Sequence, residues 1–247
     1  MPEAKILHIE ETESTNLYLR KLSEEKTLPN GFSVYSDFQT AGRGQRGNSW
    51  ESEKGLNLTF STILYPVQLK AENQFLISQI VSLSIYDTLS EYTDGISIKW
   101  PNDIYWKDRK ITGMLIENDI MGDYISKSII GVGVNLNQDI FKSDAPNPVS
   151  LKQITHKTCN IESVLISILE KLSSYYKLLN DTAATHRIRD TYKDALFRKN
   201  GLYKFADAEG FFFARIKNVK DIGLLCLETE TGEIRNYGFK EVRYILD

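Results

Sequence analysis

Three strand-like segments, 103–106, 109–118 and 124–135, follow one another with only a few residues between them. Parallel strands need a crossover connection of about a dozen residues or more, whereas antiparallel strands can be joined by a tight turn. The spacing therefore predicts an antiparallel or mixed sheet and argues against a repeated βαβ winding.

The remaining apolar patterns add strands and helices to this sheet. Period-two or β-branched runs predict further strands, and apolar residues at helical spacing predict helices, two of them preceded by the cap residues Ser14 and Asn160. Pro101 has no N–H for a ladder and ends the last of these strands. We expect strands at 5–10, 32–38, 56–65 and 96–100 and helices at 15–25, 73–91, 161–179 and 184–195.

The pattern changes near residues 196–200. From residue 201 onward, five short strand-like runs alternate with turn signals such as Thr231-Gly232. This predicts an α+β chain whose domain 1–197 is a mixed, largely antiparallel sheet with flanking helices. Residues 198–247 are expected to form a small β-barrel docked on it, since about fifty residues are marginal alone.

Composition narrows the class of protein. Of 247 residues, 41% are hydrophobic, and 30 Lys+Arg nearly balance 33 Asp+Glu for a net charge of −3. This is too apolar for disorder and too weakly charged to indicate nucleic-acid binding. No apolar run approaches the roughly 20 residues that span a bilayer, and residues 1–5 lack a signal-peptide pattern. With only Cys159 and Cys226, we expect a reduced cytoplasmic protein without membrane contact.

A glycine-rich stretch at 39–50 carries the first functional signal. Gly42, Gly44 and Gly47 satisfy GxGxxG, but the next segment is strand-like and the expected downstream acid is missing, which excludes a dinucleotide fingerprint. Asn48 replaces the lysine of a phosphate-binding P-loop. What remains is a loop that contains two arginines and no acid and whose glycines let the backbone approach a ligand closely. The loop therefore either binds an anion or is a solvated surface loop.

Three further motifs accompany the loop: residues 12–16 (Thr-Glu-Ser-Thr-Asn), residues 99–103 (Lys-Trp-Pro-Asn-Asp) with 109–113, and residues 131–137. In this order and spacing they resemble the catalytic core of the biotin protein ligases, and the C-terminal residues 238–242 resemble that family's last domain. The resemblance implies a class II synthetase-like biotin/lipoyl ligase core.

The resemblance also implies an activity in two steps. Biotin's carboxylate attacks the α-phosphorus of ATP to give biotinyl-5'-AMP, and a lysine of the biotin carboxyl carrier protein of a carboxylase then takes the biotin. ATP, Mg²⁺ as counter-ion and biotin are the implied small molecules. Lys99 is the implied catalytic residue, because a compact ammonium can contact both the carboxylate and the phosphate as charge builds.

The resemblance assigns the other site residues motif by motif. Hydroxyl and amide side chains suit a ureido ring, whose carbonyl accepts and whose N–H groups donate. The implied biotin-binding residues are Ser14, Thr15, Asn16, Gln39, Gly42, Arg43, Gly44, Gln45, Lys99 and Gly113. The implied ATP-binding residues are Arg43, Arg46, Trp50, Lys110 and Asn135. No protein metal ligand is assigned, although Asn102 and Asp103 either turn the chain or help hold magnesium.

Two departures refine these expectations. Gln45 stands where many members carry an arginine, which implies weaker retention of the adenylate. Only eleven residues precede Thr12, too few for a three-helix DNA-binding domain, so we expect no nucleic-acid partner. An edge strand in the first domain leaves a homodimer open.

Two other functions remain as alternatives. A lipoate-type ligase would share the fold, but its glycine triplet with a downstream histidine is not found around His8, His156 or His186. A non-catalytic biotin sensor would have no need of Lys99 and two loop arginines. Carrier specificity and product formation distinguish these alternatives.

Overall fold

The computed structural model describes residues 5–142 and 147–246. The segment 1–4, part of the signal-peptide argument, lies outside the described residues. Within the described ranges, none of the helices combines the length and hydropathy required to cross a bilayer.

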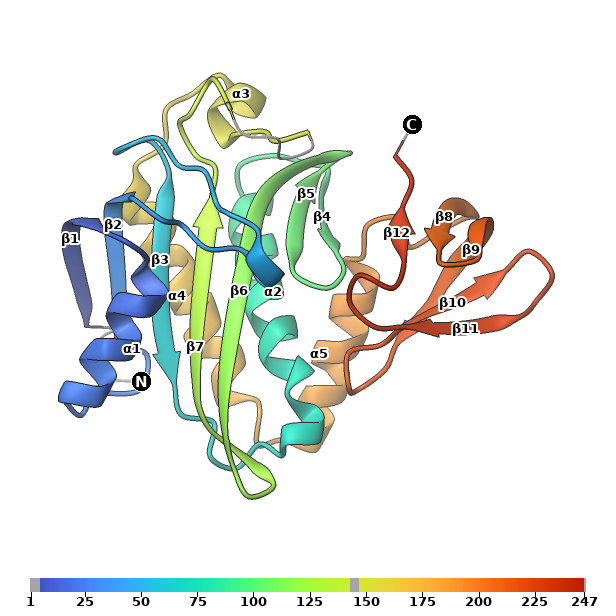
Figure 1. The fold of residues 1–247 in the computed structure, drawn as a ribbon, viewed down its shortest axis with the longest axis horizontal. Coiled ribbons are helices and arrows are strands. Elements are labelled where there is room, and N and C mark those ends of the chain that lie inside the picture. The colour runs from blue at the N-terminus through green and yellow to red at the C-terminus, as the bar shows by residue number, and fades with distance from the viewer. Residues whose placement is uncertain (1–4, 143–146, 247) are drawn as a thin grey trace.

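A seven-stranded sheet forms the body of the molecule (Figure 1). Its order is β1-β2-β3-β7-β6-β5-β4, and only the β1–β2 pair is parallel. This confirms the predicted mixed, largely antiparallel sheet, in which β5, β6 and β7 are neighbours joined by short connections. The strands are β1 (Ile6–Thr12), β2 (Ser33–Gln39), β3 (Leu58–Leu64), β4 (Ile96–Lys99), β5 (Asp103–Trp106), β6 (Arg109–Met121) and β7 (Tyr124–Val134).

Helices cover both faces of this sheet (Figure 1). Helix α1 packs on one face through Leu19, which clusters with Val34 and Ile129 of the sheet. Helices α2 and α4 pack on the other, with α5 against α2, in the larger core. The helices are α1 (Thr15–Glu25), α2 (Phe75–Ser90), α3 (Leu151–Thr155), α4 (Ile161–Lys177) and α5 (Thr182–Asp194), with 3₁₀ turns η1 (Gln45–Gly47) and η2 (Ala71–Asn73).

Helix α3 was not predicted, because its five residues are too few to show an apolar period. Its signal was local: Ser150 and Gln153 form a capping box, in which each side chain bonds the other's backbone N–H.

A second, antiparallel sheet of five strands follows, in the order β11-β10-β9-β8-β12. The expected run of short C-terminal strands is confirmed, whereas the domain boundary at 197/198 stays a prediction. The strands are β8 (Tyr203–Asp207), β9 (Gly210–Val219), β10 (Leu225–Thr229), β11 (Ile234–Tyr237) and β12 (Arg243–Tyr244).

The segment between the two sheets runs along the edge strand β4. Ile98 N–H donates to the Ala195 carbonyl, and Phe197 N–H donates to the Ile98 carbonyl, each at 2.8 Å. The second sheet is tied to the same end, because Trp100 Nε1 donates to the Gly223 carbonyl at 2.9 Å. Lys99 therefore lies at the junction of the two sheets.

Candidate active site

A cavity of about 1070 Å³ opens where the start of α1, the glycine-rich loop, strands β4–β7 and the C-terminal segment meet. Twelve of the predicted site residues line it. They are Ser14, Thr15, Asn16, Gln39, Arg43, Gly44, Gln45, Trp50, Lys99, Lys110, Gly113 and Asn135. Gly42 is not among the lining residues, and the Arg46 side chain lies outside what the structure describes.

Gln39 ends β2 beside the start of α1. Its Oε1 accepts from the backbone N–H of Thr15 at 2.8 Å and from the Thr15 hydroxyl at 3.1 Å. A backbone N–H can only donate, so the amide oxygen faces Thr15 and the amide nitrogen remains as a donor. Gln39 therefore brings an available N–H group to the cavity wall.

Ser14 occupies the N-cap position of α1, but its side chain makes no capping hydrogen bond. The predicted N-cap position of Ser14 is confirmed, whereas the capping hydrogen bond expected from its side chain is not formed. Asn160, the other predicted cap, does accept from Ser163 N–H, at 2.8 Å. Ser14 is 3% exposed and lines the cavity, so its hydroxyl is left for a ligand.

The glycine-rich loop folds back on itself as a small hairpin. Trp50 N–H donates to the Gly42 carbonyl at 2.9 Å, and Gly44 N–H donates to the Asn48 carbonyl at 2.7 Å. Between these two hydrogen bonds, Arg43 and Ser49 form an antiparallel β-bridge through their backbones. A Cβ on Gly42 would lie 2.5 Å from the Trp50 carbonyl oxygen. Gly42 thus shapes the loop from behind the cavity wall.

Trp50 at the end of this loop lies over two strand glycines. A Cβ on Gly113 would come within 2.9 Å of the indole ring, and one on Gly133 would overlap the ring. Gly133 therefore makes room for the indole ring of Trp50. The indole Nε1 is buried with no hydrogen-bond partner in the described part of the chain, so the ring carries an unused donor.

Lys99 ends β4 inside an aromatic setting. Its Nζ donates to the Tyr105 hydroxyl at 2.9 Å and lies 4.6 Å from that ring's centroid and 5.4 Å from the Tyr244 centroid. Burial lowers the pKa of Lys99 below that of an ordinary lysine, while the nearby Asp103 carboxylate works in the opposite direction. The ammonium is therefore poorly solvated and available to an anion.

Lys110 and Asp103 form an ion pair at 2.7 Å on the same wall. Asn102 turns its amide inward to donate to the Met114 carbonyl. In residues 5–142 and 147–246, no three His, Cys, Asp or Glu side chains gather as a metal site. Asn135 Oδ1 is buried without a partner among the described residues and faces no competing bond.

The C-terminal segment supplies part of the wall, which the sequence did not predict. Its lining residues are Phe239, Lys240, Val242, Arg243 and Tyr244. Tyr244 packs on Phe205 and Phe197 with centroid distances of 5.0 and 6.0 Å. No local pattern could reveal that a residue 145 positions from Lys99 would reach it.

Comparison with known proteins places this geometry in a family. A sequence model of the biotin/lipoate A/B protein ligase family matches residues 8–135, about half of the chain. The bifunctional ligase/repressor BirA of Bacillus subtilis is 29% identical over 212 residues, covering 83% of this chain and 63% of that protein. The chain thus spans less than two thirds of that relative's length.

Other relatives match over nearly their full length. The biotin–[acetyl-CoA-carboxylase] ligase of Paracoccus denitrificans is 27% identical over 235 residues, covering 90% of this chain and 93% of that one. The structure of the Aquifex aeolicus biotin protein ligase in complex with biotin and ATP superposes with a TM-score of 0.78 at 26% identity, covering 98% and 99% of the two chains. These matches include the second sheet.

Proposed function

Because the chain belongs to the biotin/lipoate A/B protein ligase family, we propose that it is a biotin protein ligase. It activates biotin with ATP to biotinyl-5'-AMP and transfers biotin to a lysine of a biotin carboxyl carrier protein. The observation that carries the proposal is that motifs distant in sequence line one cavity, with amides and hydroxyls from Ser14 to Gln39 and cations from Arg43 and Lys99.

In the first step a carboxylate oxygen of biotin attacks the α-phosphorus of ATP, and pyrophosphate leaves. Two anions must be brought together, so the task is positioning and charge neutralisation. Lys99 is the catalytic residue in this proposal, since its poorly solvated ammonium gains most from the charge that develops between carboxylate and phosphate. Arg43 and Lys110 add positive charge at the nucleotide side.

In the second step the carrier's lysine amine attacks the carbonyl carbon of the adenylate, and AMP leaves.

The other site residues bind the two ends of the adenylate. Trp50 offers a ring face for the adenine, and the unpartnered Asn135 Oδ1 offers a polar contact. Ser14, Thr15, Asn16 and Gln39 meet the ureido ring. The backbone of Gly44 and Gln45 borders the reacting groups, and Gly113 leaves room for Trp50.

Magnesium supplies counter-charge for the phosphates. Mg²⁺ keeps several waters and binds through one or two carboxylates plus phosphates. Asp103 and Asn102 line the cavity and fit an ion that arrives with the nucleotide. A homodimer through an edge strand of the first domain, a cytoplasmic location and the lack of a nucleic-acid partner stay predictions.

The test uses the purified chain with apo-carrier, biotin and ATP–Mg²⁺. We expect one added biotin on the carrier by mass spectrometry and none when ATP is omitted. Lipoate in place of biotin should give no product, and a lipoylated carrier would favour the lipoate-type alternative. Binding of biotin without any adenylate or transfer would favour the sensor.

A further inference from the structure

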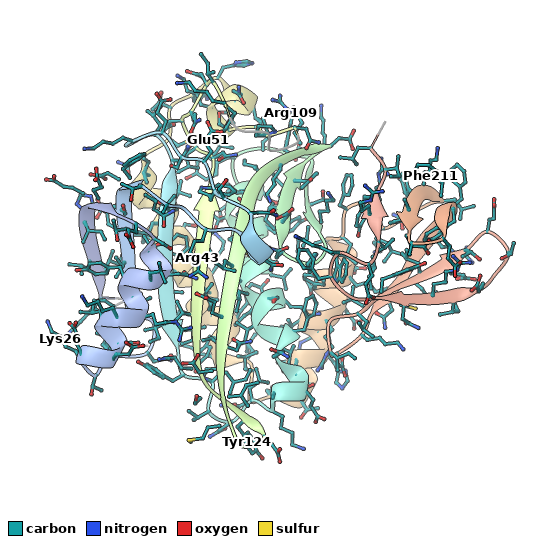
Figure 2. All side chains as sticks on the ribbon, in the orientation of Figure 1. Lys26, Arg43, Glu51, Arg109, Tyr124 and Phe211 are labelled. Carbon is teal, nitrogen blue, oxygen red and sulfur yellow. The ribbon has the colours of Figure 1, made fainter. Side chains whose placement is uncertain are left out.

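Glu117 of β6 ties the start of α1 to the glycine-rich loop. Its Oε2 accepts from Asn16 Nδ2 at 3.0 Å, and its Oε1 accepts from Arg43 Nη2 at 3.2 Å. The Glu117 side chain is 24% exposed and the Arg43 side chain 40%, so the pair is partly shielded from water. Figure 2 shows Arg43 lying across the sheet face. Glu117 itself does not line the cavity, although both of its partners do.

The contacts of Asn16 determine which way its amide points. Asn16 Nδ2 donates to Glu117 and, at 3.3 Å, to the Leu115 carbonyl, which can only accept. Its Oδ1 accepts from the Ser61 hydroxyl at 2.6 Å. Both N–H groups are therefore used on β6, and the free capacity of Asn16 is the second lone pair of Oδ1. Asn16 offers the cavity an acceptor.

Gln39 has the opposite polarity, because its oxygen accepts from Thr15 while its nitrogen has no hydrogen-bond partner among the described residues. The wall thus offers one acceptor and one donor, the complement of a group that carries N–H and C=O together. We propose that Glu117 is a positioning residue for biotin: it holds Asn16 as an acceptor for a ureido N–H and holds Arg43 beside the cavity. This rests on the proposed function.

An acid at this place balances the charge of Arg43. The loop 39–50 contains no acid, so Arg43 would otherwise lie against the sheet without a counter-charge. A charge-assisted hydrogen bond in a partly shielded site is stronger than one in open water. Glu117 therefore restricts both groups before the ligand arrives, which lowers the ordering cost of binding.

Two substitutions separate the contributions of Glu117. Glu117→Gln keeps an oxygen for Asn16 but loses the ion pair with Arg43, whereas Glu117→Leu loses both. We expect the Kd for biotin, measured by calorimetry, to rise about two- to fivefold in Glu117→Gln and at least tenfold in Glu117→Leu. The KM for ATP should rise less than the Kd for biotin in both variants, because Arg43 itself is retained and keeps its charge for the nucleotide, whereas Asn16 loses its charged partner.

Asp119→Asn is the matched control. Asp119 lies two residues along the same strand and pairs with Arg20 and Lys127 at 3.2 and 3.1 Å, away from the cavity lining. The Asp119→Asn substitution removes one negative charge, as the Glu117 substitutions do, and the Kd of this variant for biotin should stay within about twofold of wild type. Equal losses in Asp119→Asn and Glu117→Leu would overturn the proposal, because they would reflect general destabilisation of β6.

The affinity for biotin methylated at one or the other ureido nitrogen distinguishes a positioning role of Glu117 from a merely structural one. One methylated form should bind wild type much more weakly because it removes the N–H that meets Asn16, and this penalty should shrink at least fivefold in Glu117→Leu. An unchanged penalty, or unchanged biotin affinity in both Glu117 variants, overturns the inference. A wild type that binds biotin but makes no adenylate overturns the proposed function instead.

Discussion

Lys99 lies in a partly buried site where a positive charge lowers the stability of the folded protein. Tyr105 and Tyr244 surround the ammonium, and within the described residues Lys99 Nζ donates to a phenol rather than to a carboxylate. Because the folded-state pKa is lowered, the unfolded chain holds the proton more tightly than the native one. Protonated Lys99 therefore costs stability at neutral pH, and this cost decreases as the pH rises through the lowered pKa and is gone above the pKa of an ordinary lysine.

Lys99→Met tests this trade. Methionine fills a similar volume without a charge, so we expect the thermal midpoint to equal or exceed that of wild type, while biotinyl-AMP formation falls by at least a hundredfold. Calorimetric unfolding at pH 7 and pyrophosphate release measure the two effects. A large loss of stability with retained turnover would assign Lys99 to structure rather than to catalysis.

Gln45 concerns retention of the intermediate. Gln45 is a neutral residue that lines the cavity in the same loop as the positively charged Arg43. In Gln45→Arg an added guanidinium near the phosphate should slow release of preformed biotinyl-5'-AMP several-fold, because a charge-assisted contact is gained. Chase of labelled adenylate with unlabelled biotin and ATP gives the rates. Equal rates would show that residue 45 does not contact the adenylate.

The residues at the N-termini of two helices serve different purposes, one stabilising its helix and the other facing the cavity. Asn160 caps α4, whereas Ser14 occupies the same position of α1 without capping it. Asn160→Ala should cost about 1 kcal/mol of unfolding free energy and leave biotin affinity unchanged. Ser14→Ala should cost less stability than Asn160→Ala but weaken biotin binding several-fold. Denaturant unfolding and calorimetry measure both, and the reverse pattern would contradict a ligand role for Ser14.

The sequence predicted the elements whose signals are local. The antiparallel core followed from short connections between 103 and 135, and long amphipathic helices followed from their apolar period. Helix α3, too short for a period, was missed. Glu117 could have been predicted from the sequence, because alternate residues of a strand share a face and Gly113, four residues earlier in the same strand, was already a predicted site residue. Tyr244 could not, because only packing of the second sheet brings it to Lys99.

The molecule as a whole brings the C-terminal segment, which ends the second sheet, to the cavity wall built by the first sheet. The Trp100–Gly223 hydrogen bond, the Arg198 bond to the Ile245 carbonyl at 2.7 Å and the packing of Tyr244 hold the C-terminal segment against the end of β4. The second sheet thus supplies a wall that excludes water from the ammonium. An effect of this sheet on the chemistry should pass through Tyr244.

Tyr244→Leu should lower kcat of adenylate formation about tenfold or more, because the ring that shields Lys99 is lost. Less burial raises the pKa of Lys99, so the alkaline limb of the pH–rate profile should move to higher pH. Tyr203→Leu is the control, since Tyr203 lies on the same sheet, stacks on Arg198 at 4.8 Å and does not line the cavity. If both variants lose activity equally without a shift of the limb, the tyrosine acts only by holding the sheet in place.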